Sequence, residues 1–350
     1  MKMRVYKPKI LLLSLLLIST VNFSMSAQDA RKEYHENYAV NKGVTLDAET
    51  RYSNVEIVTW ERNEVDILAV VEVDASSKSR AEEALSKVDI VINKSGNTIS
   101  LETELENGWS RGVKTKIKIT VKAPAYLNLT IENSYGDLFV QELSGLALLD
   151  LQYSNLKAGK LSRGNEKPYN RLELSYSNGT IEETGWMELE IAYSDLEINS
   201  SAMLFMKSKY SKLIGEKAGG IITDGAYDKY YIDELDSFVA ELKYSGLKFE
   251  RLNKTLNLQA TYTNAKIDRL SRDFDEMDVS LAYGNLNLGM ESGASYKIDA
   301  ESRYGNIKVA EGDNLSRSKE TTTTKVWGTV GSNPKGTIKA ITKYGNIEIE

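Results

Sequence analysis

The chain of 350 residues has no cysteine, a single histidine and only four prolines. Without cysteine no disulfide can form, so the fold must be stabilised by its own core or by a repeat architecture. The one histidine, His35, has no converging partners in the sequence, which argues against a zinc site or a catalytic triad, and we place it in a solvated tail before the first strand. Motifs for nucleotide binding, ester hydrolysis or metalloproteolysis are also missing. We therefore expect no catalytic residue, no metal and no cofactor.

Long apolar runs are missing except near the N-terminus. Four basic residues within positions 2–9 precede an apolar stretch at residues 10–18, and small residues follow up to Ala27. This order is typical of a secretory signal peptide, and the stretch is too short to span a bilayer. We predict a signal peptide over residues 1–27, with an uncleaved anchor as the alternative. After cleavage we expect no transmembrane segment and an exported protein, located in the periplasm or associated with the cell surface or outer membrane.

Positive charge is not in excess. The chain carries 44 basic and 50 acidic residues, and removing four basic residues with the signal peptide leaves 40 against 50. A nucleic-acid partner would require a basic stripe to meet its phosphates. We therefore expect no nucleic-acid partner.

What the sequence does have is a tyrosine repeat. Twelve of the 20 tyrosines begin a short motif, Tyr-Ser/Gly-Asn or a close variant, at Tyr52, Tyr135, Tyr153, Tyr176, Tyr193, Tyr210, Tyr227, Tyr244, Tyr262, Tyr283, Tyr304 and Tyr344. From the second copy onward the spacings are 18, 23, 17, 17, 17, 17, 18, 21, 21 and 40 residues, and the last fits a degenerate copy or an inserted loop. A unit of 17 residues leaves no room for a helix. The repeat predicts an all-β, parallel β-helix-like solenoid of about 11 to 13 coils.

The phase of the apolar residues locates the corner of each unit. Around Tyr244, apolar residues alternate from Phe238 to Leu242 and resume one residue out of phase at Leu247. Alternation with period two indicates strands, and the shift indicates a corner. Because the tyrosine is in phase with the preceding apolar residues, we expect an internal tyrosine stack. The alternative is an outward row of rings that could stack on sugars.

The other corner residues lead to two further expectations. Asparagines at equivalent positions of stacked coils predict a hydrogen-bonded ladder. Glycines at Gly284, Gly305 and Gly345 predict a positive φ that disfavours a side chain.

The two ends of the repeat differ from its middle. Residues 28–130 contain a single copy of the motif and a helical pattern near residues 76–88, for which Asp74, Ser76 and Ser77 offer N-cap oxygens. We predict a strand-rich N-terminal module with one short helix at 28–130 and the repeat solenoid at 131–350. The polar segment 313–324 is typical of a loop or a disordered insertion.

Outward acidic residues bear on an alternative function. Polysaccharide-cleaving solenoids require carboxylates that converge on one face in adjacent coils. Outward positions hold acidic residues that are mixed with lysine and serine and form no clean column in the sequence: Glu190, Glu197, Asp233, Glu234 and Glu241. This pattern favours a protein that is not an enzyme. A column of outward carboxylates and aromatic residues in the folded protein would instead favour a carbohydrate ligand.

Four copies carry a resemblance to a known family. They read Tyr-Gly-Asn-Ile-Lys-Val (304–309), Tyr-Gly-Asn-Ile-Glu-Ile (344–349), Tyr-Gly-Asn-Leu-Asn-Leu (283–288) and Tyr-Gly-Asp-Leu-Phe-Val (135–140). These segments resemble the repeats of the bacterial putative-adhesin β-solenoid family, related to the auto-transporter adhesin head (GIN) domain common in Bacteroidetes. The resemblance covers most of residues 40–350 and implies a right-handed solenoid with no catalytic residues. Lysine or glycine replaces asparagine in the copies from Tyr210 to Tyr244, which weakens the expected ladder there.

These patterns predict an exported, non-catalytic binding or scaffold protein of the cell envelope, with adhesion as one form of that role. Two alternatives stay open: a carbohydrate-active or carbohydrate-binding β-helix protein, and an envelope-stress accessory protein. The expected partner is an envelope or surface protein or a glycan. Trp186 and Trp327 lie in or near the longer spacings and are candidate partner contacts, although each could equally fill the edge of a coil.

Overall fold

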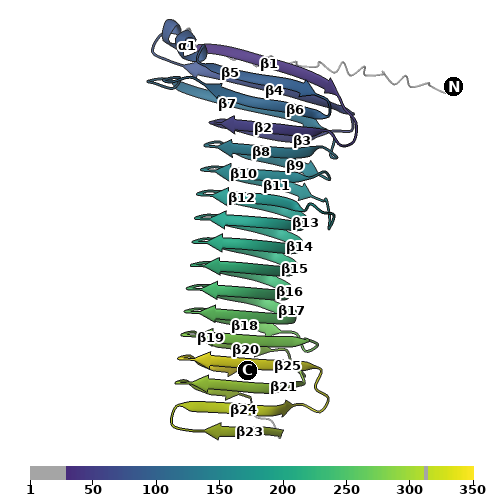
Figure 1. Ribbon diagram of the computed structural model, residues 1–350, viewed down its shortest axis with the longest axis vertical. Coiled ribbons are helices and arrows are strands. Elements are labelled where there is room, and N and C mark those ends of the chain that lie inside the picture. The colour runs from purple at the N-terminus through teal and green to yellow at the C-terminus, as the bar shows by residue number, and fades with distance from the viewer. Residues whose placement is uncertain (1–28, 311–313) are drawn as a thin grey trace, which may run out of the picture.

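The structure is a computed structural model that describes residues 29–310 and 314–350, so the predicted signal peptide at 1–27 lies outside the described residues. The described residues form 26 strands and one helix, stacked in a long column (Figure 1). The prediction of an all-β solenoid is confirmed. Within these residues, no helix combines the length and the apolar character needed to cross a membrane.

Each coil crosses the molecule twice, once before and once after a motif tyrosine. Five coils use one continuous strand of 15 or 16 residues for both crossings: β13 (Asn178–Ala192), β14 (Asp195–Lys209), β15 (Lys212–Ala226), β16 (Lys229–Lys243) and β17 (Gly246–Thr261). The second half of each belongs to what we call the pre-Tyr sheet, with β2 (Thr45–Arg51), β8 (Asn128–Ser134), β10 (Ala147–Gln152), β12 (Asn170–Ser175), β19 (Glu276–Ala282), β21 (Tyr296–Arg303) and β25 (Gly336–Lys343). The first half belongs to the post-Tyr sheet, with β3 (Ser53–Thr59), β9 (Leu138–Leu143), β11 (Asn155–Leu161), β18 (Asn264–Leu270), β20 (Leu286–Met290), β22 (Ile307–Val309) and β26 (Ile347–Ile349).

Parallel pairing joins each coil to the next. In β13 and β14, Ile181 pairs with Ile198 and Leu189 pairs with Met206. The two halves of each strand, one in each sheet and here called its arms, therefore pair in the same register. Side chains alternate between buried and exposed along the arms, and the inner faces of the two sheets share one apolar core. Adjacent strands are about 4.8 Å apart, so equivalent residues form columns along the axis.

The corner between the sheets is set by the motif tyrosine. All twelve tyrosines have a positive φ, between 52° and 64°. A residue in this left-handed region breaks the period-two rule, which holds only for extended backbone. The inward residue of the corner is therefore the one after the tyrosine, such as Ser194 or Ser211. The expectation of a positive φ at Gly284, Gly305 and Gly345 is wrong, because the left-handed residue is the preceding tyrosine.

The inward corner residue is serine or glycine at ten of the twelve corners, and Asp228 and Thr263 at the other two. Where it is serine, its hydroxyl links two coils: Ser194 Oγ donates to the Ala192 carbonyl at 2.8 Å and accepts the Ser177 N–H at 3.0 Å. Where it is glycine, the backbones approach too closely for a side chain, since a Cβ on Gly345 would lie 1.8 Å from the Gly284 carbonyl oxygen. Close approach, and not φ, thus requires glycine at this position.

The asparagine ladder is confirmed in two segments. Hydrogen bonds link equivalent asparagines or aspartate in the series Asn54, Asp137, Asn155 and Asn178, and again in the series Asn264, Asn285, Asn346 and Asn306. Between the two segments the motif carries Lys212, Lys229 and Gly246. Lys212 instead pairs with Asp195. The ladder is interrupted where the motif departs from asparagine, as expected.

The N-terminal end is covered by a cap. It comprises β1 (Asp29–Ala39), β4 (Glu64–Asp74), α1 (Lys78–Leu85), β5 (Val88–Ser95), β6 (Thr98–Leu105) and β7 (Lys114–Ala123). β7, β4 and β1 extend the post-Tyr sheet, and the antiparallel β5–β6 hairpin extends the pre-Tyr sheet. The predicted helix is confirmed, with Ser77 as its N-cap. His35 lies within β1, so its placement in a tail is wrong. The division at residue 130 stays a prediction.

The C-terminal end departs from sequence order. β25 pairs with both β19 and β21, so the last coil of the chain lies between two earlier ones (Figure 1). The end of the pre-Tyr sheet is covered by β23 (Asn314–Lys319) and β24 (Thr323–Val330), which pair antiparallel with each other and through β24 with β21. The prediction of a loop or disordered insertion at 313–324 is therefore wrong: most of that segment is hairpin. The polar residues of β23, among them Ser316, Arg317 and Ser318, suit an edge strand.

Candidate binding groove and tyrosine edge

The twelve motif tyrosines form a continuous external stack. Neighbouring rings have centroids 4.6 to 5.1 Å apart and are within 15° of parallel, from Tyr52 to Tyr304. Each side chain is 41 to 56% exposed. The expectation of an internal stack is wrong, because the left-handed tyrosine points its side chain away from the core. Tyr344 stacks between Tyr283 and Tyr304, which repeats the coil order of the strands.

The geometry of the stack limits what it can bind. Each ring covers the faces of its neighbours, and Trp109 packs against the first ring, Tyr52, at 5.1 Å. Sugar stacking requires an open ring face, whereas this row presents ring edges and phenol hydroxyls along its length. The row therefore has a structural role: its stacked rings form a side-chain ladder along the corners of successive coils.

A long groove lies on the outer face of the pre-Tyr sheet. One hollow of about 950 Å³ extends over β12 to β17, and a second of about 650 Å³ continues over β19, β25 and β21. The two hollows share Asp224, Glu241 and Gln259. We call the combined feature the axial groove. It crosses nine strands, or about 40 Å along the solenoid axis at the usual strand spacing.

The floor of the axial groove carries an apolar strip. Phe205, Ile222 and Val239 are cross-strand neighbours in β14, β15 and β16, and the latter two are 41% and 40% exposed. Outside the tyrosine row, six large apolar residues of the described ranges 29–310 and 314–350 are exposed: Leu68, Ile222, Tyr231, Val239, Trp327 and Ile341. Four of these six lie on the outer face of the pre-Tyr sheet. Exposed apolar surface is therefore concentrated on the face that holds the groove.

An aromatic cluster closes one end of the strip. Tyr169, at the end of the 162–169 loop, stacks on Phe205 at 5.5 Å, and Trp186 packs against both rings at 5.3 and 5.6 Å. Of the two tryptophans singled out in the sequence, Trp186 thus belongs to this cluster. Trp327 lies further along the same face, opposite Asp299 in β21, and is 44% exposed.

Several polar side chains beside the strip have no partner among the described residues. The structure gives no side-chain hydrogen bond or ion pair, within its described residues, to Lys207, Asp224, Glu241, Asn257 or Gln259, all of which line the groove. At the N-terminal end, in contrast, Arg171 is paired with Glu173 and Glu190. Donors and acceptors are thus both available to a ligand in the middle of the groove.

A column of carboxylates leads into the groove. Directly paired positions of successive strands hold Glu102, Glu49, Glu132, Asp150, Glu173 and Glu190, and beyond Lys207 the column resumes with Asp224 and Glu241. The expectation that outward carboxylates form no clean column is therefore wrong. Partial burial and the neighbouring Glu173 and Glu132 raise the pKa of Asp150 above its usual value. Like charges in direct register repel one another.

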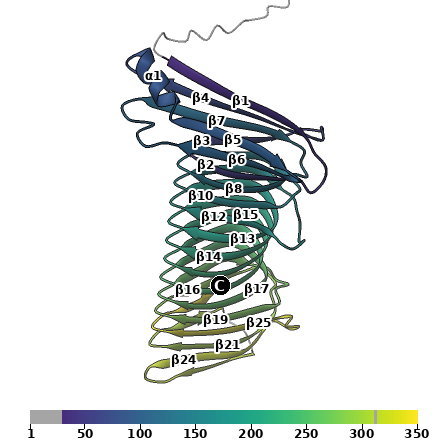
Figure 2. The ribbon, with the colours of Figure 1, turned by 45° about the horizontal axis from the view of Figure 1, so that its top comes forward.

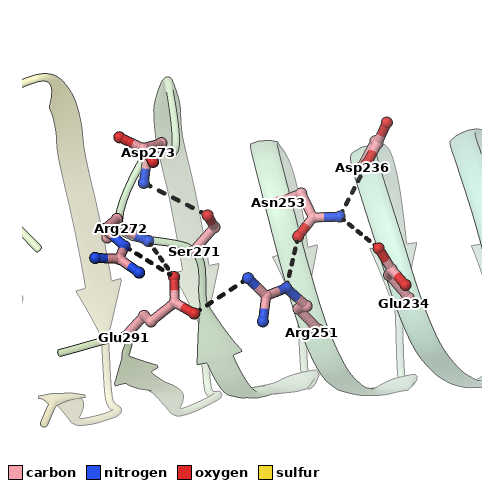
Figure 3. A network of polar contacts seen from close by, with 8 residues as sticks. All are labelled: Glu234, Asp236, Arg251, Asn253, Ser271, Arg272, Asp273 and Glu291. Atoms are coloured by element: carbon pink, nitrogen blue, oxygen red, sulfur yellow. Dashed lines mark hydrogen bonds and ion pairs between the residues drawn. The ribbon is translucent and has the colours of Figure 1, made fainter.

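The edge opposite the tyrosines, here called the bend edge, carries polar networks. Asn253 Nδ2 donates to Glu234 at 3.1 Å and to Asp236 at 2.9 Å, and Arg251 connects Asn253 to Glu291 (Figure 3). Although partial burial opposes the effect, hydrogen bonds from Asn253 and Lys254 lower the pKa of Asp236. All these groups have partners within the protein, so the network stabilises the bends and leaves no vacant ligand position.

The remaining residues singled out in the sequence lie apart from one another. His35 contacts the Asp66 carboxylate at 2.9 Å on the exposed side of the cap. Residues 29–310 and 314–350 contain no group of three or more His, Cys, Asp or Glu residues arranged to hold a metal ion. Glu197 and Asp233 are in the post-Tyr arms, and Glu190 and Glu241 are in the pre-Tyr arms, so these four carboxylates are divided between the two faces.

These features define a class, the β-solenoid repeat proteins. Residues 45–350 match the family described as Toastrack DUF4097, and the chain belongs to that family. The resemblance to putative-adhesin β-solenoid proteins is confirmed. No curated protein matches the chain.

Three solved structures are similar to this chain over 91% of its length. One is described as a putative cell adhesion protein from Clostridium sporogenes, with 9% identity, 99% of that chain covered and a TM-score of 0.21. A second is a putative adhesin from Bacteroides fragilis, with 10% identity, 97% covered and a TM-score of 0.30. The third is described as a putative lipid binding protein from Parabacteroides distasonis, with 9% identity, 96% covered and a TM-score of 0.32. No ligand is transferred from them to this chain.

Proposed function

We propose that this protein is an exported, non-catalytic binding protein of the bacterial cell envelope, and that its partner lies along the axial groove. The observation that carries the proposal is the coincidence, in one groove, of an exposed apolar strip and unpartnered polar side chains. Exposed apolar surface rimmed by polar groups is typical of binding sites. Export through the signal peptide at 1–27 and a periplasmic or surface location belong to the same proposal.

Two features of the groove favour binding over catalysis. It is shallow and extends along the molecule, whereas catalysis requires a few groups that converge on one reacting atom. Its polar side chains are also repeated in columns along the axis. Such a surface suits a partner that makes many similar contacts, as in adhesion to an extended surface polymer.

One observation favours glycan cleavage as a second candidate function. Asp224 and Glu241 are cross-strand neighbours within the groove, and paired carboxylates are the groups that hydrolyse glycosidic bonds. Release of reducing ends from envelope polysaccharide by the purified protein, lost in both Asp224→Asn and Glu241→Gln, would establish cleavage. Binding without such release would favour the non-catalytic role.

Retention of the purified protein on isolated cell envelopes tests the binding role. The double variant Ile222→Ser/Val239→Ser removes the apolar strip from β15 and β16. The matched control Ile214→Ser/Tyr231→Ser changes a cross-strand pair on the same two strands but on the outer face of the post-Tyr sheet. We expect at least tenfold weaker retention for the groove variant and unchanged retention for the control. Equal retention of wild type and both folded variants would refute the groove as the binding site.

A further inference from the structure

We propose that the C-terminal half of the tyrosine edge, the line of corners that carries the stacked rings, docks on an anionic lipid membrane surface. We call this half, which comprises the seven corners from Tyr210 to Tyr304 along the axis, the basic half-edge. The inference concerns a surface other than the axial groove and does not depend on what occupies the groove. It follows from three properties of the edge: its charge, its rings and its shape.

Basic residues gather along the basic half-edge. At each corner, four outward positions lie nearest the tyrosine: one and three residues before it, and two and four residues after it. At the seven corners these positions hold four acidic residues, which are Asp224, Glu241, Glu301 and Glu348. They hold ten basic residues, which are Lys207, Lys209, Lys212, Lys229, Lys243, Lys248, Lys266, Arg303, Lys308 and Lys343. The half-edge is therefore net positive in a chain that is net negative.

The N-terminal half of the same edge is acidic. At the five corners from Tyr52 to Tyr193, the equivalent positions hold only two bases, Arg51 and Lys157. They hold nine carboxylates, which are Glu49, Glu56, Glu132, Asp137, Asp150, Glu173, Glu190, Asp195 and Glu197. Both halves carry the tyrosines, so charge decides which half meets an anionic surface.

Half of the ten bases are available to an anionic partner. Within residues 29–310 and 314–350 no ion pair is made by Lys207, Lys209, Lys229, Lys243 or Lys343. The ammonium groups of Lys209 and Lys343 lie 5.5 and 5.2 Å from the ring centroids of Tyr210 and Tyr344. Asp228, at an inward corner position, is buried and is not part of this surface. Ammonium groups and phenol hydroxyls thus line the edge together, and both donate hydrogen bonds to the phosphate oxygens of lipid headgroups.

The rings of the edge suit the boundary between lipid and water. Tyrosine is enriched at membrane interfaces because its ring is apolar and its hydroxyl is polar. The seven rings of the basic half-edge are 41 to 56% exposed. Neighbouring rings cover each other's faces, so the exposed part consists of ring edges and hydroxyls. This is the part that a tyrosine places in the headgroup layer.

The shape of the edge favours a planar partner over a chain. The carboxyl ends of the pre-Tyr strands form one straight side of the column, at the left of Figure 1. Ring centroids repeat every 4.6 to 4.9 Å along the basic half-edge. It therefore extends over about 30 Å at the usual strand spacing. A flat surface contacts all seven corners at once, whereas a linear polymer on a projecting edge has no walls to enclose it.

Sedimentation with lipid vesicles tests the docking surface. Residues 28–350 are used, because they contain every described element and leave out the apolar stretch at 10–18. We expect binding to vesicles of phosphatidylglycerol and phosphatidylcholine, reversed by about 0.5 M NaCl, and none to phosphatidylcholine alone. Lys209→Glu/Lys229→Glu should weaken the binding at least tenfold, and neither lysine lines the axial groove. No binding to the anionic vesicles, or equal binding to neutral ones, would overturn the proposal and leave the groove function intact.

Two controls separate the edge from net charge and from soluble polyanions. Lys42→Glu/Lys94→Glu makes the same change of charge at exposed positions before β2 and before β6 and should bind as wild type. An equal loss in both double variants would show that net charge decides binding, which would overturn the docking surface. Polygalacturonate, at the same concentration of negative charge as the vesicles, should release less than one tenth of the bound protein. Release of most of it would assign the lysines to an anionic polymer and overturn the membrane as partner.

The division of the edge supplies a second measurement. The chain has no cysteine, so a single introduced cysteine can carry an environment-sensitive fluorophore. Thr261→Cys and Ser175→Cys are a matched pair, because each position directly precedes a motif tyrosine, one in each half of the edge. On anionic vesicles we expect a blue shift of the emission from position 261 and none from position 175. A shift at position 175 alone, or at neither position, would overturn the docking surface, and equal shifts would overturn its assignment to the basic half-edge.

Discussion

The tyrosine edge and the bend edge join the same two sheets, yet only the tyrosine edge keeps one conformation in every coil. All twelve corners there have a left-handed tyrosine, and its ring stacks on the next. The bend edge is continuous strand in β14, a loop at 162–169, and a shifted register between Leu235 and Ser237 in β16. Figure 2 shows the regular turns of the stack and, near its ends, longer loops that project from it.

The difference indicates that the two edges contribute differently to the register of the fold. A left-handed non-glycine residue costs about 1 to 2 kcal/mol, and stacking returns about 0.5 to 1.5 kcal/mol per ring pair. The tyrosine edge can offset its strain only while every coil stays in register, so it fixes the register of the whole stack. The bend edge has no such requirement and accepts insertions. The 162–169 loop, which brings Tyr169 to the groove, is one of these insertions.

The largest expected effect is at a glycine of the tyrosine edge. Gly345→Ala would place a Cβ 1.8 Å from the Gly284 carbonyl oxygen, so the two coils must separate. We expect a loss of about 3 kcal/mol in the free energy of unfolding, measured by urea denaturation of the C-terminal coils. Gly246→Ala is the control: it is also at a corner, has no positive φ, and a Cβ there would have no neighbour within 4 Å. Equal losses for both would show that the close approach is not rigid.

The next effect separates strain from stacking at one tyrosine. Tyr244→Ala removes two ring contacts and keeps a side chain in the left-handed region, so we expect a loss of about 2 kcal/mol. Tyr244→Gly removes the same contacts but also relieves the strain, and we expect a loss of about 1 kcal/mol. Thermal unfolding of both variants is the measurement. A glycine variant less stable than the alanine variant would mean that the φ of this corner costs nothing.

The third prediction concerns the one carboxylate at an inward corner position. Asp228 accepts the Ser211 N–H at 2.8 Å, as the serine hydroxyls do in other coils, but its burial raises the pKa of the carboxyl above its usual value. A raised pKa in the folded state means that stability is greatest at low pH and falls as pH rises through the folded pKa. Asp228→Ser should therefore stabilise the protein by roughly 0.5 to 1 kcal/mol at pH 7, with no gain at pH 4. Urea midpoints at the two pH values check this, and a gain that is equal at both would contradict it.

The fold could be predicted because its signals are local. Period-two alternation and the motif residues identify strands and corners wherever they occur. The direction of the tyrosines could not be obtained in this way, since one left-handed residue reverses the side that the alternation assigns. The position of the last coil could not be predicted either. The copies at Tyr283, Tyr304 and Tyr344 have nearly the same motif, so nothing in them specifies which pairs with which.

The residues of the groove form a pattern in the sequence that is visible only when the copies of the repeat are compared. Phe205, Ile222 and Val239 are 17 residues apart, and each precedes its motif tyrosine by five positions. The carboxylate column is likewise three positions before the tyrosine in successive copies, as at Glu132, Asp150 and Glu173. Alignment of the copies on the tyrosine would have shown both columns. Tyr169 is different, because its place in the groove depends on the path of the 162–169 loop.

The smallest expected effect is at the bend edge. Asn253→Ala removes the hydrogen bonds to Glu234, Asp236 and Arg251, but these groups are near water and can be solvated when Asn253 is lost. We expect a loss of only about 0.5 to 1 kcal/mol by urea denaturation. The pKa of Asp236 should rise, since Asn253 helps to lower it, and NMR titration of its carboxyl carbon would measure the change. The comparison of the two edges requires this loss to be well below that of Gly345→Ala. A loss of 3 kcal/mol here would mean that the bend edge also fixes the register, and that the loops of the groove are tied to the stability of the whole solenoid.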